Sequence, residues 1–207
     1  RLTTDKPAVL AKRYEQADAA RSAFASTVEF NTPDPYLNPI GGAMVMAADG
    51  AWDGTVWTHG AVGWRMPLPG WRAAYMGDFL GMPDRQRIHF TAYGNSQVTD
   101  VPATISHPTQ DPENNLARGI YKWGTPMYSN GYICRNPNKN NQFSHYDMNL
   151  AYIDELLWHF QFDADTTYMR QMWPVIKRHL AWEKLNWDPD NDGLYHAYCC
   201  IWASDAL

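Results

Sequence analysis

The sequence predicts an all-α chain, and two features carry that prediction. Residues 7–27 combine Ala, Leu, Tyr and Phe with Lys, Arg and Glu and contain no Gly or Pro after Pro7. Toward the other end, apolar residues recur at helical spacing in residues 145–162 and again in residues 166–185. Such spacing places apolar side chains on one side of a helix, where they can pack against a core. The composition, 45% hydrophobic and 19% charged, is that of an ordinary globular chain.

The first helix is expected over residues 7–27, where the composition favours helix throughout. From residue 30 to about residue 144, Pro and Gly recur every few residues, so helices there must be short. The best candidates are residues 43–48, 71–80 and 83–94. Residues 94–144 are rich in Asn, Pro and Ser and predict mostly a loop, and loops this long are usually functional.

The clearest periodicity follows this loop and predicts a pair of antiparallel helices joined by Asp163-Ala164-Asp165. Pro174 lies within the second of them. Because proline removes a backbone donor, either the helix begins near Trp173 with Pro174 in its first turn, or the helix is kinked.

Residues 52–72 concentrate large aromatic and polar side chains among small residues. Indole faces stack on the apolar faces of sugar rings, and arginines donate directional hydrogen bonds to hydroxyls or to a uronic carboxylate. We therefore expect a carbohydrate substrate. The substrate-binding candidates in this segment are Trp52, Trp57, His59, Trp64, Arg65, Trp71 and Arg72. The structural alternatives are a large aromatic core and internal ion pairs of the two arginines with Asp78 or Asp84.

Glycoside hydrolysis needs two carboxyl groups across the scissile bond. Asp53, between an indole and a glycine, is the first candidate, with an Asx turn as its structural alternative. Asp147 begins the clearest helix and is the second, with a capping role as its alternative, and His145 beside it is a substrate-binding candidate. Glu155 lies two turns into an apolar helix, where a paired structural carboxylate is expected.

The order of these parts resembles the six-hairpin glycosidases, in which a helix ends in an aspartate-rich turn, Gly-Leu-Tyr follows, and aromatic and acidic residues open the next inner helix. The matching residues are Asp165 to Pro174, then Asp190-Asn191-Asp192-Gly193-Leu194-Tyr195, then Ile201-Trp202-Ala203-Ser204-Asp205. Residues 52–72 are similar to an active-site-facing segment of uncharacterised members from polysaccharide-degrading bacteria. The resemblance covers residues 30–207.

This resemblance implies an (α/α)6 toroid that hydrolyses an oligo- or polysaccharide without an organic cofactor, and it adds Asp205 as a third catalytic candidate. It also implies a periplasmic or extracellular location. A closed toroid takes about 350 residues, so residues 30–207 would be an N-terminal portion of the barrel, after a helix or linker in residues 1–29. The rest of a longer polypeptide or a partner chain would complete it. The chain begins at Arg1, so a removed leader remains an alternative.

Two other functions remain open: a polysaccharide lyase or sugar epimerase on the same toroid, with His59 as base and Arg65 as carboxylate ligand, and a non-catalytic glycan-binding domain. Nucleic acid is not expected as a partner, since the net charge is -5 and the cationic residues are scattered. No apolar run is long enough to cross a membrane. Asp188, Asp190 and Asp192 mimic half of a calcium loop, but a solvated turn is the preferred interpretation, and no metal site is expected.

Overall fold

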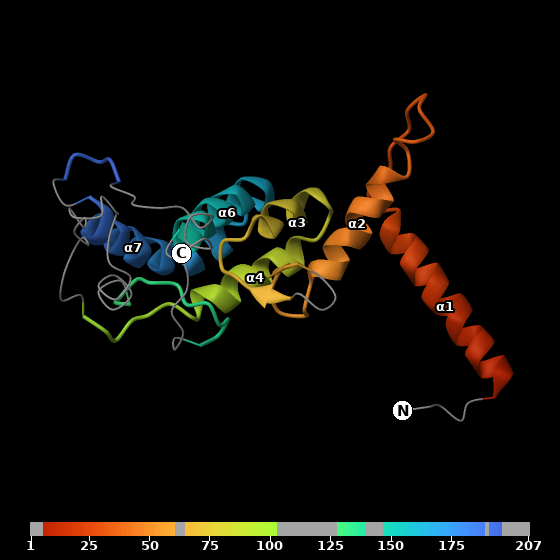
Figure 1. Cartoon of the computed structure of the whole chain (residues 1–207), viewed down its shortest axis with the longest axis horizontal. Helices are drawn as coiled ribbons and strands as arrows, with labels where there is room; N and C mark the ends of the chain where they lie inside the picture. The colour runs from red at the N-terminus through yellow and green to blue at the C-terminus, as the bar shows by residue number, and fades with distance from the viewer. Residues whose placement is uncertain (1–5, 61–64, 103–127, 140–146, 189–190, 196–207) are drawn as a thin grey trace, which may run out of the picture.

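The computed structural model describes residues 6–60, 65–102, 128–139, 147–188 and 191–195. These residues are mostly helical, which agrees with the predicted all-α class. Helix α1 (Pro7–Ala25) projects from one end of the molecule and contacts α2 (Ile40–Ala51), while α3 (Met76–Phe79), α4 (Pro83–Gly94), α6 (Asp147–Asp163) and α7 (Thr166–Trp187) form the body (Figure 1).

Helix α4 lies at the centre of the body and contacts α3, α6 and α7. The predicted bounds of residues 83–94 are confirmed, and Pro83 starts the helix, where its fixed φ fits the first turn. Phe90 and Tyr93 of α4 pack edge to face against Tyr152 of α6, with ring centroids 5.8 and 6.2 Å apart. The Tyr152 hydroxyl donates a hydrogen bond of 2.7 Å to the Phe90 carbonyl. These contacts fix the position of α6 against α4.

The two predicted C-terminal helices are present as α6 and α7, and they pack against each other. Asp165 caps α7, because its Oδ1 accepts hydrogen bonds from the Thr167 and Tyr168 amides at 2.8 and 3.2 Å. These amide bonds lower the pKa of the Asp165 carboxyl, and the Arg87 guanidinium adds to the effect. Helix α7 runs through Pro174, so the alternative start near Trp173 is wrong. Packing of α7 on α4 and α6 outweighs the one lost backbone hydrogen bond.

A small element that the sequence did not predict links α2 to α3. Strand β1 (Thr58–His59) pairs antiparallel with β2 (Met66–Pro67), and a 3-10 helix, η1 (Arg72–Tyr75), leads into α3. The helix predicted over residues 71–80 is therefore two short pieces, η1 and α3. Helix η1 contacts α6, so this linking segment lies against the helix that carries Glu155.

Gly70 allows the linking segment to approach α6 closely. A Cβ atom at this position would overlap the Met148 carbonyl oxygen and lie 2.6 Å from the Tyr152 amide nitrogen. Both atoms are backbone and cannot move aside, so we expect Gly70→Ala to destabilise the protein by about 1–3 kcal/mol. Urea unfolding measures this. Gly50→Ala is the control, because nothing lies within 4 Å of its Cβ, and stability there should stay equal or rise. Equal stability of both variants would contradict the close approach.

Candidate functional site

Trp57, predicted to bind substrate, lies in the core with 1% of its surface exposed. Its indole Nε1 donates a 2.5 Å hydrogen bond to Gln86 Oε1, and its backbone amide donates to His89 Nδ1 at 3.1 Å. Neither face of the ring is open to a sugar. The substrate-binding role predicted for Trp57 is therefore corrected to a structural one, because α4 supplies partners for both its polar groups.

Asp53 forms the Asx turn that was the structural alternative. Its Oδ1 accepts hydrogen bonds from the Thr55 and Val56 amides, both at 2.8 Å. Gly54 follows with a φ of 101°, which only glycine adopts readily. The Asp53 side chain is nonetheless exposed, and its Oδ2 has no hydrogen-bond partner among the described residues. One oxygen therefore holds the turn, and the other is available to solvent.

Three more of the predicted aromatic ligands are half-buried. Trp52 packs edge to face on Trp57, with centroids 5.0 Å apart, and so sits over the core. His59 and Trp71 lie together, 4.1 Å between ring centroids, although twelve residues separate them in the chain. Trp71 also packs on Leu68 and Met148. The predicted aromatic segment thus splits into a buried indole and a half-buried His59–Trp71 pair.

The remaining candidate site residues are exposed or lie partly or wholly outside the described residues. Arg65 is exposed and donates a 2.6 Å hydrogen bond to the Gly50 carbonyl, and Arg72 is exposed at the start of η1. Asp147 is the first residue of α6, as predicted, but its side chain lies outside the described residues. Trp64, His145 and Asp205 also lie outside them.

Glu155 of α6 is the strongest chemical feature of the described chain. Its side chain is completely buried, and neither carboxyl oxygen has a hydrogen-bond partner among the described residues. Burial raises its pKa well above the ordinary 4.5, and the nearby Asp154 charge raises it further. Within the described chain Glu155 has no partner of the kind expected from the sequence, and its burial favours the neutral form of the carboxyl group.

Tyrosines surround this acid. Burial is the largest effect that raises the pKa of Tyr75, Tyr93 and Tyr152, and Glu155, when ionised, adds a smaller rise to each. The Tyr93 hydroxyl is buried and has no hydrogen-bond partner within the described ranges. Asp53 also raises the pKa of Tyr93, so both Asp53 and Glu155 lie within electrostatic range of its hydroxyl. The candidate site is therefore centred on the buried Tyr93 hydroxyl, on which both carboxyl groups act electrostatically.

His89 and Gln86 are site-supporting residues that sequence reasoning missed. Burial lowers the pKa of His89 to about 3, although the Pro69 carbonyl opposes the shift, so the ring is neutral. A neutral ring leaves Nδ1 free to accept from the Trp57 amide. Gln86 is buried near the start of α4, although its neighbours in the sequence are charged. Its place on the side of the helix that carries apolar residues was the one sign of burial available in the sequence.

The raised pKa of Glu155 predicts how stability depends on pH. The folded chain holds this proton above pH 4.5, whereas the unfolded chain releases it there, so stability falls as pH rises from about 4.5 to the folded pKa. The slope from this one group is at most about 1.4 kcal/mol per pH unit. Urea unfolding of the protein and of Glu155→Gln at pH 4.5, 5.5 and 6.5 isolates it. The two proteins should differ in slope, and parallel curves would contradict a buried protonated acid.

The two described histidines of the C-terminal helices are buried in the core, where the Nδ1 of each has a partner but the Nε2 of each has no hydrogen-bond partner among the described residues. His159 Nδ1 lies 2.9 Å from Asp78 Oδ2, and His179 Nδ1 lies 2.8 Å from the Gly131 carbonyl. In the aspartate-rich turn, Asp188 and Asp192 accept hydrogen bonds from the amides of Gly193 and Leu194, while Asp190 lies outside the described residues. Across the described ranges, no three His, Cys, Asp or Glu side chains are grouped to hold a metal ion.

Comparisons with protein-family models, with curated proteins and with solved structures find no match to this chain. Among the helices that the structure describes, none combines the length and apolarity that a membrane span requires.

Proposed function

We propose that this chain is part of a glycoside hydrolase built on an (α/α)6 toroid, with Glu155 as the proton donor. The observation that carries the proposal is the burial of Glu155, whose carboxyl group has no partner among the described residues and whose pKa is raised by that burial. A general acid needs a carboxyl group whose pKa is raised toward the working pH. Perturbed acids of this kind concentrate at functional sites.

Asp53 is the proposed second carboxylate. It is exposed, and its Oδ2 has no partner among the described residues while Oδ1 holds the turn. An ionised carboxylate can act as a base toward water or as a nucleophile, and the protonated one gives its proton to the leaving oxygen. The two environments, one wet and one apolar, push the two groups into these different roles.

The half-buried aromatic residues supply the sugar contacts in this proposal. His59 and Trp71 form one platform, and Trp52 forms another beside Asp53. Arg65 and Arg72 are exposed nearby in sequence and bring hydrogen-bond donors for sugar hydroxyls. Trp57 is left out, because its indole is enclosed.

The proposal requires that the substrate gain access to the buried Glu155 carboxyl group. Glu155 is fully buried, so a glycosidic oxygen reaches it only if packing around α6 changes when the glycan binds. Carbodiimide labelling followed by peptide mapping tests this. Glu155 should be unreactive in the free protein and become reactive when a glycan that the protein hydrolyses is added.

The decisive experiment is a screen of the protein against neutral and uronic oligosaccharides, with Asp53→Asn and Glu155→Gln as variants. A hydrolase releases reducing ends, and both variants lose this activity. A lyase instead produces an unsaturated ring that absorbs in the near ultraviolet, which would replace the proposal with elimination chemistry. Binding without any turnover would replace it with a non-catalytic glycan-binding role.

A further inference from the structure

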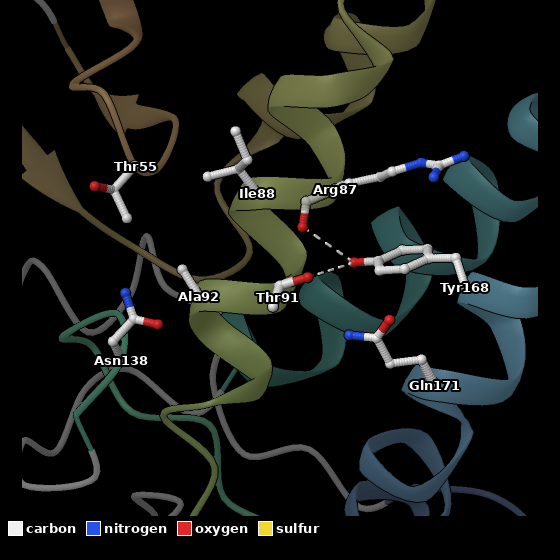
Figure 2. Close-up of a pocket in the computed structure, with 8 residues that line it drawn as sticks. All are labelled: Thr55, Arg87, Ile88, Thr91, Ala92, Asn138, Tyr168 and Gln171. Atoms are coloured by element: carbon white, nitrogen blue, oxygen red, sulfur yellow. Dashed lines mark hydrogen bonds between the residues drawn. The ribbon is translucent and has the colours of Figure 1, made fainter.

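A groove lies along α4, and Glu155 is not among its lining residues. It has a volume of about 420 Å³, within the usual range for small-molecule sites, and is largely open to solvent. Figure 2 shows Thr55 and Asn138 on one side of α4 and Tyr168 and Gln171 on the other. The lining residues come from four separate segments and are Thr55, Arg87, Ile88, Thr91, Ala92, Asn138, Tyr168 and Gln171.

Uncharged polar groups on both sides of this groove are available for a ligand. The Thr55 hydroxyl and the Gln171 amide have no hydrogen-bond partner within the described part of the chain. Asn138 uses its Oδ1 to accept from Asn95 Nδ2 at 3.2 Å, which leaves its own amide group free to donate. In Figure 2 the Gln171 amide points toward α4. Hydroxyl and amide groups of this kind suit the hydroxyls of a sugar.

The floor of the groove is apolar. Ile88 is 47% exposed, and Ala92 lies one turn further along the same side of α4. The Tyr168 hydroxyl is engaged with Thr91 Oγ1 at 3.1 Å and with the Arg87 carbonyl at 3.2 Å, which fixes one wall. A pyranose ring presents C–H groups on its faces and hydroxyls around its rim, and this floor and these walls match that distribution.

The charges around the groove disfavour an anionic ligand. Arg87 is its one cation among the described lining residues, and Asp163 and Asp165 hold the guanidinium at 2.6 and 3.0 Å. The hydrogen bonds that the Arg87 guanidinium donates to Asp163 raise the pKa of Arg87. A carboxylate or phosphate entering the groove would meet two carboxylates around one guanidinium, and like charges repel. The balance therefore favours an uncharged ligand.

We propose that this groove binds a neutral sugar ring as a subsite of the glycan, next to Asp53. This inference rests on the proposed function for the identity of the ligand as a saccharide. Thr55 belongs to the same Asx turn as Asp53, so a ring seated against Thr55 lies beside the proposed second carboxylate. The substrate class is then a neutral glycan rather than a uronic one.

Ligand-observed NMR titration tests this, because it reports binding whether or not the sugar is cleaved. The probes are maltotriose, cellotriose, xylotriose and mannotriose as neutral trisaccharides, and trigalacturonic acid as the anionic one. We expect at least one neutral probe to bind more tightly than trigalacturonic acid. Thr55→Val with Gln171→Leu should weaken that binding at least tenfold, since both changes keep side-chain size and remove hydrogen bonds. Gln161→Leu, exposed on α6 outside the groove, is the matched control and should have no effect.

Three results would overturn the inference: no neutral trisaccharide binds, trigalacturonic acid binds more tightly, or the double variant binds as the protein does. Failure of the proposed function looks different. If Asp53→Asn and Glu155→Gln leave hydrolysis unchanged while the double variant loses sugar binding, the groove stands and the carboxylate assignment falls. If hydrolysis depends on Glu155 and the double variant binds sugar normally, the carboxylate assignment stands and the groove is not a sugar subsite.

Discussion

Replacing Glu155 by glutamine is expected to lower kcat by about 10²–10⁴-fold, the range that general acid catalysis contributes. Glutamine keeps the size of the side chain but has no proton of carboxylic-acid strength to transfer. Because the side chain is buried and unpaired among the described residues, the substitution breaks no described hydrogen bond, so folding should be unaffected. Steady-state kinetics on the best substrate of the screen measure kcat, and circular dichroism checks the fold.

Asp154→Asn is the matched control, because it changes the neighbouring carboxyl group. Asp154 is exposed, and it accepts a hydrogen bond from the Tyr75 hydroxyl, which an asparagine oxygen can also accept. We expect less than a threefold change in kcat there. The pH profile adds a readout that a merely structural role would not move: kcat should fall as pH rises through the raised pKa of Glu155, and Glu155→Gln should lose that limb. Full activity of Glu155→Gln would refute the acid assignment.

The helices were predictable because the residues that determine them lie within each helical segment. In α6 and α7 the apolar residues repeat at helical spacing, and the bounds of α4 follow from Pro83 at one end and Gly94 at the other. Pro174 shows the limit of this reasoning. Its local preference is to end a helix, yet α7 continues through it, since contacts with α4 and α6 come from distant parts of the chain.

The candidate site was less predictable, because its groups are assembled by long-range contacts. Trp57 is enclosed by Gln86 and His89, which lie 29 and 32 residues further along the chain. Nothing in residues 52–72 reveals those partners, so the indole could equally have faced a ligand. The burial of the Tyr93 hydroxyl, on which both carboxyl groups act electrostatically, likewise depends on how α4 packs against α6.

Glu155 was visible in the sequence but was misinterpreted. It follows Tyr152 by three residues and precedes His159 by four, so it lies on the same side of α6 as two buried side chains. That spacing predicts burial. The expectation of a partner came from the general rule that buried charges are paired. Among the described residues no partner is present, and burial favours the neutral acid, which avoids the cost of an unpaired buried charge.

Replacing Trp57 by alanine is expected to destabilise the protein by about 3–5 kcal/mol, the usual cost of removing a buried large aromatic side chain. The substitution also leaves the Gln86 oxygen without its indole donor and removes the edge-to-face contact with Trp52. Arg85, which lies 5.6 Å from the Trp52 ring and 5.9 Å from the Trp57 ring, loses one of its cation–π partners. Urea unfolding monitored by circular dichroism measures the change.

Trp173→Ala is the matched control, because this indole on α7 is 50% exposed and its loss should cost about 0.5 kcal/mol or less. The comparison separates two roles for the aromatic segment. A sugar-stacking indole would lose affinity on truncation while the fold kept its stability, whereas an enclosed one unfolds the protein before affinity can be measured. If Trp57→Ala were as stable as Trp173→Ala, the enclosed position of Trp57 would be wrong. The indole would then return to the set of sugar ligands, beside Trp52 and Trp71.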